Sequence, residues 1–144
     1  MASPLDSWIF WALLSAGFAA LTAIFAKVGI ANVNSDYATF VRTIVILLAA
    51  GGIVAANGAW QDPATVSAKT WTFLVLSGLA TGLSWICYFR ALKLGNAARV
   101  APIDKLSVVL VAVFATLFLG EKLSAPAWAG VGLIAAGATL VALN

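Results

Sequence analysis

An acid and a base stand side by side within one of the most apolar stretches of this chain. Asp104 and Lys105 interrupt the apolar residues between Val100 and Leu119, and Ser107 follows two residues later. If that stretch crosses a membrane, each ionisable group costs at least about 2.5–3.5 kcal/mol at the bilayer centre, so such residues mark functional sites by default. The pair could therefore face a polar cavity, where one of the two contacts a solute or carries a proton.

A structural role would explain the same two charges. Each could pair with another charge, such as Arg90 or Arg99, and fix the start of a helix. Arg99 precedes them by about 7–9 Å of helical rise, which is within snorkelling reach for Lys105 but not for the shorter Asp104. Because neighbouring helical positions point about 100° apart, the two residues need not pair with one another. The sequence leaves both interpretations open.

Two residues in other apolar stretches could contribute to the same site. Arg42 lies five residues into the second stretch, where it could meet Asp36 or Asp104. Trp85 lies midway along the third, as either a lipid-facing or core ring or the aromatic wall of a cavity. The candidate substrate or coupling residues are Asp104, Lys105, Trp85, Ser107 and Arg42.

The sequence lacks the usual signatures of an enzyme or a metalloprotein. It has no histidine, a single cysteine and no Walker A, HExxH or G-x-S-x-G pattern. No pattern joins a nucleophile to a base, so we expect no catalytic residue, no cofactor and no metal. The lone Cys87 cannot form an intramolecular disulfide.

Composition indicates that the solvent of this chain is lipid. Of its 144 residues, 63% are hydrophobic and 9% are charged, whereas soluble domains carry about 25% charged residues. The apolar runs are continuous, which favours helices over the alternating strands of a β-barrel. The basic residues lie mostly at the ends of these runs, as topology signals do, so we expect no nucleic-acid binding. The sequence predicts an all-α integral membrane protein.

Five apolar stretches are long enough to cross a bilayer, since about 20 residues span about 30 Å of hydrocarbon. They cover residues 8–27, 37–56, 71–91, 100–119 and 127–143, and short turns rich in Asn, Asp, Gly and Pro separate them. The first is too long for a signal peptide and follows no basic segment, so we expect a retained helix. These stretches predict one membrane domain over residues 1–144, a bundle of five transmembrane helices.

Breaker residues indicate the limits of the fourth helix. Pro102 is expected in its first turn, where a proline is tolerated. Gly120 and Glu121 are expected to end it.

Glycines indicate where helices could approach closely. Gly78 and Gly82 form a GxxxG motif in the third stretch, and Gly130 and Gly137 lie one heptad apart in the fifth. These faces could pack helices within one subunit, or they could form a dimer seam, for which the fifth stretch is the preferred place.

Charge asymmetry predicts the orientation of the chain. Four basic residues fall at the ends of the stretches on the side of the C-terminus, and two fall on the other side. The first group is Lys27, Arg90, Lys93 and Arg99, and the second is Lys69 and Lys122. The positive-inside rule therefore favours an N-terminus outside and a C-terminus inside the cytoplasm.

Several motifs of the C-terminal half resemble the EamA domain of the drug/metabolite transporter superfamily. They are Phe89-Arg90-Ala91-Leu92, Gly95, Ala97-Ala98, Val100-Ala101-Pro102-Ile103, Leu119-Gly120-Glu121-Lys122-Leu123, Trp128, Gly130 and Gly137. Over the first two stretches only the span count and Arg42 fit. The run Asp104-Lys105-Leu106-Ser107 is similar to the five-segment bacterial/archaeal transporter branch.

The resemblance implies a secondary transporter, often an exporter of small metabolites or drugs, in the cytoplasmic (inner) membrane of a bacterium or archaeon. Many members join two such units with inverted symmetry, so one unit implies a homodimer or a heterodimer with a paralogue. If protons drive transport, Asp104 and Glu121 are the expected carriers, with Asp36 behind them. The alternative is a non-transporting membrane subunit or chaperone, which would need the glycine faces but not the charges.

Overall fold

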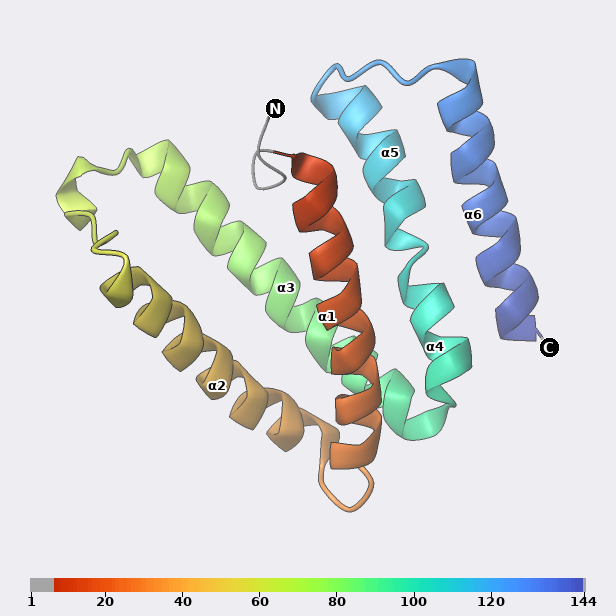
Figure 1. The fold of residues 1–144 in the computed structure, drawn as a ribbon, viewed down its shortest axis with the longest axis horizontal. Helices are drawn as coiled ribbons and strands as arrows, with labels where there is room; N and C mark the ends of the chain where they lie inside the picture. Colours follow the sequence, from red (N-terminus) through yellow and green to blue (C-terminus); the bar gives the residue numbers. More distant parts are fainter. Residues whose placement is uncertain (1–6, 144) are drawn as a thin grey trace. The chain divides into compact units, whose positions relative to one another are not determined.

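The computed structural model describes residues 7–143, and all regular secondary structure in that range is helical (Figure 1). The helices are α1 (Trp8–Gly29), α2 (Ser35–Ala56), α3 (Ala68–Leu94), α4 (Ala97–Asp104), α5 (Ser107–Phe118) and α6 (Ala125–Leu143), with a short 3₁₀ turn, η2 (Pro63–Thr65), before α3. Because α4 and α5 together form one span, five spans are long and apolar enough to cross a membrane. The predicted all-α class with five spans is confirmed.

The helices extend beyond the predicted spans because polar side chains cap their ends. The Asn34 side-chain oxygen accepts hydrogen bonds from the amides of Asp36 and Tyr37, at 2.8 and 3.2 Å. The Ser67 hydroxyl accepts one from the Thr70 amide at 3.1 Å. These bonds satisfy amide groups that the first turn of a helix leaves without partners. As a result, α2 begins at residue 35 and α3 at residue 68, rather than at 37 and 71.

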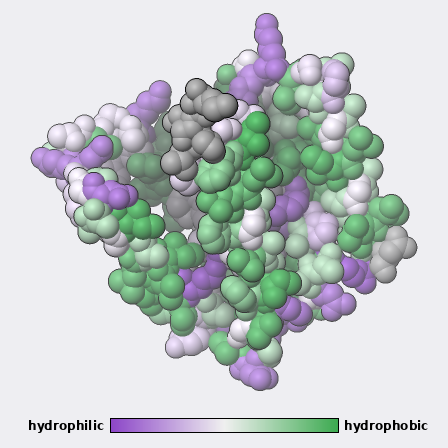
Figure 2. All heavy atoms as spheres, in the orientation of Figure 1, coloured by the Kyte–Doolittle hydropathy of each residue, from purple (hydrophilic) through white to green (hydrophobic). Residues whose placement is uncertain are grey.

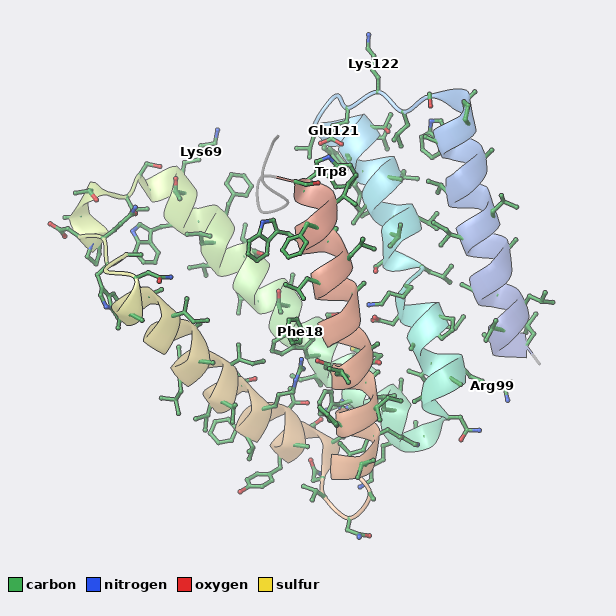
Figure 3. All side chains as sticks on the ribbon, viewed as in Figure 1. Trp8, Phe18, Lys69, Arg99, Glu121 and Lys122 are labelled. Atoms are coloured by element: carbon green, nitrogen blue, oxygen red, sulfur yellow. The ribbon has the colours of Figure 1, made fainter. Side chains whose placement is uncertain are left out.

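Gly120 and Glu121 end the α5 helix, as the sequence predicts. Gly120 has a φ of +69°, a conformation that side-chain-bearing residues rarely adopt. The Glu121 amide then donates to the Ala115 carbonyl at 3.2 Å, which folds the chain back over the helix end. Figure 3 shows Glu121 and Lys122 in the loop that follows, with the Lys122 side chain pointing away from the ribbon.

The fourth span is not the continuous helix that the sequence predicts. Helix α4 ends at Asp104, and α5 begins at Ser107. Pro102 lies inside α4, five residues after its first residue, so the prediction of a helix-start role for Pro102 is wrong. A proline there has no N–H to donate, and its ring crowds the carbonyl of Ala98 one turn earlier, which kinks or breaks helices. The break follows within one turn.

The chain divides into two compact units. Residues 28–93 form the first unit, called the α2–α3 unit. Residues 94–143 form the second unit together with residues 7–27, which contain most of α1 (Trp8–Gly29), and this second unit is called the α4–α6 unit. Within the α4–α6 unit, α6 packs against both α4 and α5. A single domain over residues 1–144 stays a prediction, and residues 1–6 and 144, which include the N-terminus of the predicted orientation, lie outside the described range.

Apolar side chains cover the outer surface of the spans. The buried apolar residues are few and mostly small: Ala23, Ala26, Ile30, Phe89, Leu92, Ala112 and Ala138. Large residues such as Leu13 and Leu117 are 69% and 70% exposed. Figure 2 shows the same pattern, with hydrophobic residues over most of the visible helix surface. Such a surface would drive association in water, whereas lipid tails are as apolar as leucine and solvate it without that cost.

Candidate functional site

The break between α4 and α5 carries the adjacent acid and base. Lys105 Nζ lies 3.4 Å from Asp104 Oδ2, and the two side chains are 57% and 34% exposed. The partners considered from sequence are engaged elsewhere, because Arg90 pairs with Asp36 and Arg99 donates to a helix end. The two neighbouring residues therefore pair with each other.

The backbone at the break follows the tighter hydrogen-bond pattern of a 3₁₀-helix. The Leu106 amide donates to the Ile103 carbonyl and the Val108 amide to the Lys105 carbonyl, each at 3.0 Å. In a continuous α-helix the Val108 amide would donate to the Asp104 carbonyl instead. Local 3₁₀ adjustments of this kind provide partners for backbone groups that a proline frees in a membrane helix. The break therefore keeps backbone hydrogen bonds while it changes the direction in which the neighbouring side chains project.

Ser107 opens α5 directly after this pair. It is exposed, and its hydroxyl makes no hydrogen bond to any residue in the range 7–143. Its donor and acceptor are therefore available to a ligand. Asp104, Lys105 and Ser107 are called the break site below.

Arg42 and Trp85 lie together within the α2–α3 unit. The Arg42 guanidinium carbon lies over the Trp85 ring, 4.1 Å from its centroid, and 5.4 Å from the centroid of Phe89. Such contacts are cation–π interactions. The meeting of Arg42 with Asp36 considered from sequence does not occur, because Arg90 binds both Asp36 oxygens, at 2.9 and 2.6 Å. Arg42, Trp85 and Phe89 form an arginine–aromatic cluster.

Basic residues predicted to mark the cytoplasmic side also bind backbone carbonyls at helix ends. Lys27 Nζ donates to the Gly95 carbonyl at 2.7 Å, and Lys93 Nζ donates to two carbonyls in the turn after α1. Arg99 Nε and one terminal nitrogen both donate to Ala142, at 3.0 and 2.6 Å. Cations are stabilising where helices leave carbonyls without partners. Sequence reasoning missed this role, which only the spatial proximity of the helix ends reveals.

The glycine faces are open within each unit. A Cβ atom added at Gly78, Gly82, Gly130 or Gly137 would meet no heavy atom within 4 Å apart from the neighbouring backbone of its own helix. Helices of the same unit therefore make no close backbone approach at these positions.

Five apolar spans, one of them broken around an ion pair, define a multi-pass α-helical membrane protein. The chain belongs to the EamA-like transporter family, which matches residues 6–143. A protein of Sinorhizobium sp named "Uncharacterized transporter in cobO 3'region" is 66% identical over 138 residues, which are 96% of this chain and 98% of that protein. No solved structure matches the chain. The resemblance inferred from the motifs is thus confirmed, and the family indicates a transporter rather than an enzyme.

Proposed function

We propose that this chain is a secondary transporter that exports a small metabolite or drug-like solute across the cytoplasmic membrane of a bacterium or archaeon. The break site is the observation that carries the proposal. Transporter sites commonly lie where discontinuous helices present backbone groups near the membrane midplane. Asp104 and Lys105 follow the start of their helix, Ala97, by about 10–12 Å of helical rise and the start of the apolar run, Val100, by about 6–8 Å, so both lie inside the span rather than at its end.

The chemistry of the break site suits reversible binding of a polar solute. The Asp104 carboxylate can accept a hydrogen bond or a proton, and the Lys105 ammonium can donate to a carbonyl or an anion. Partly exposed ion pairs are weak, so a solute group can replace either partner at small cost. Ser107, Arg42 and Trp85 are the further residues that we assign to solute contact.

Reconstitution tests the proposal directly. Solutes are first selected by their ability to raise the unfolding temperature of the purified protein, since a ligand of the native state stabilises it. Their flux into proteoliposomes is then measured for the wild type, Asp104→Asn and the loop control Asp62→Asn. We expect saturable flux that falls at least about tenfold in Asp104→Asn, a loss of about 1.4 kcal/mol, and not in Asp62→Asn. Lack of any flux, together with co-purification of an unrelated stoichiometric partner, would instead support a non-transporting subunit.

We further propose that this protein forms dimers through the open face of α6. The second subunit is either another copy of the same five-span chain or a paralogue. Bulky residues at Gly130 and Gly137 would hold the partner helix away, whereas the equally open Gly17 on α1 provides a matched control. We expect Gly130→Leu with Gly137→Leu to shift dimers to monomers in nanodisc photobleaching counts, and Gly17→Leu to leave the counts unchanged. If only leucines at Gly78 and Gly82 disrupt the dimer, the seam lies on α3 instead.

The orientation also stands as a proposal, with the C-terminus in the cytoplasm. A homodimer with inverted symmetry requires both orientations, whereas the charge asymmetry favours one. We expect a C-terminal green fluorescent protein to be bright and a C-terminal alkaline phosphatase to be inactive. Comparable activity of both reporters would contradict a fixed orientation and would favour an inverted homodimer. If only one reporter is active, the orientation is fixed, and the dimer is then either a parallel homodimer or a heterodimer with an inverted paralogue.

A further inference from the structure

Arg42 is a charge inside an apolar span that has no acidic partner within its own unit. The α2–α3 unit contains two carboxylates, Asp36 and Asp62. Arg90 engages both oxygens of Asp36. Asp62 lies beyond the far end of α2, more than about 20 Å along the helix axis from Arg42. No acid of this unit therefore neutralises the Arg42 guanidinium.

The aromatic rings hold the guanidinium without using its hydrogen bonds. Trp85 and Phe89 attract the cation through their ring faces, with centroids 4.1 and 5.4 Å from Cζ. The N–H groups of an arginine lie in the plane of the guanidinium, and they donate to no atom in residues 7–143. No side-chain nitrogen or oxygen among these residues is both fully buried and unpartnered, so the Arg42 nitrogens keep some accessible surface.

We propose that Arg42, held on Trp85 and Phe89, binds the carboxylate or phosphate group of the solute that this protein moves. The planar guanidinium matches two oxygens of such a group with two parallel hydrogen bonds. Arg42 lies about 10 Å of helical rise after Ser35, the first residue of α2. A bound anion at this position would supply the negative charge that the α2–α3 unit does not provide for Arg42. The identity of the ligand as a solute rests on the proposed transport function.

A phospholipid headgroup is the other source of the same chemistry. At about 10 Å from the helix start, a long arginine side chain can reach the interfacial phosphates. Binding must therefore be measured with and without phospholipid. The two sources share the oxyanion and differ in whether a soluble anion competes for it.

The experiment compares carboxylates with their uncharged amides. Protein purified in a maltoside detergent and phosphate-free buffer is titrated calorimetrically with acetate and acetamide, benzoate and benzamide, succinate and succinamide, and then with inorganic phosphate. We expect at least one oxyanion to bind where its amide does not. Its affinity should fall at least about tenfold in Arg42→Gln, fall less in Arg42→Lys, and not change in Lys122→Gln, which removes the same charge from a loop. Circular dichroism verifies that each variant is helical.

Each other outcome overturns part or all of the proposal. If no oxyanion binds, or if binding survives in Arg42→Gln, the site is wrong. If only dihexanoyl phosphatidylglycerol binds in an Arg42-dependent manner, the ligand is a lipid headgroup and the solute assignment is wrong. If proteoliposomes move a neutral or cationic solute equally well with Arg42→Gln, the anionic substrate is wrong although transport stands. If an oxyanion binds in an Arg42-dependent manner but no solute is transported, the proposed transport function is wrong and the proposed oxyanion site stands.

Discussion

Replacing Pro102 with alanine should make this protein more stable and a poorer transporter. Alanine supplies the missing N–H for the Ala98 carbonyl and removes the ring from the helix interior, where a proline costs about 3 kcal/mol. Because the 3₁₀ bonds at the break recover part of that cost, we expect a gain of up to about 3 kcal/mol. A continuous helix would return the Val108 amide to the Asp104 carbonyl and separate the Asp104 and Lys105 side chains. Initial flux should therefore fall at least about tenfold.

Pro126 provides the matched control for this prediction. It is the second residue of α6, where the amide of any residue would lack an intrahelical partner, so Pro126→Ala should leave both unfolding temperature and flux nearly unchanged. Thermal unfolding followed by circular dichroism gives the stability, and proteoliposome uptake gives the flux. Normal transport by a stabilised Pro102→Ala protein would show that the break is not needed for function.

The break was missed from sequence because hydropathy locates apolar residues rather than helix ends. The apolar run begins at Val100, which would place Pro102 in a first turn. The helix instead begins at Ala97, because the amides of Arg99 and Val100 both donate to the Asn96 carbonyl, at 3.0 Å. That additional turn moves Pro102 into the helix interior. The turn that precedes the apolar run thus decides whether the proline starts the helix or breaks it.

The class of protein and its spans followed from composition and run length, because the cost of exposing a polar backbone to lipid allows few alternatives. The partners of the charged residues did not follow. Asp36 was one of two acids that the sequence suggested as an ion-pair partner of Arg42. In the structure Asp36 instead pairs with Arg90, which is 54 residues away along the chain. Arg42 instead contacts the rings of Trp85 and Phe89. Sequence reasoning therefore selected Arg42 and Trp85 separately, and the structure shows that their side chains are in contact.

The ion pair of the break site gives the second large expected effect. Asp104→Asn leaves Lys105 without its partner, and Lys105→Gln does the same to Asp104. An unpaired charge in a span costs about 2.5–3.5 kcal/mol at the bilayer centre and less near its edge. Because both side chains are partly exposed, we expect each single variant to lose about 1 kcal/mol or less of unfolding free energy and to transport at least about tenfold more slowly. The double variant should recover its stability to within about 0.5 kcal/mol, because it contains neither charge.

The double variant separates a structural pair from a functional one. If the two charges serve only to neutralise each other, the uncharged pair should restore flux together with stability, and our assignment of the break site would be wrong. If Asp104 and Lys105 act on the solute, stability returns while flux stays low, because asparagine and glutamine keep hydrogen-bonding groups but can neither carry the proton nor supply the charge. The two measurements on one protein therefore distinguish the roles, since a folding defect cannot explain slow transport by a stable variant.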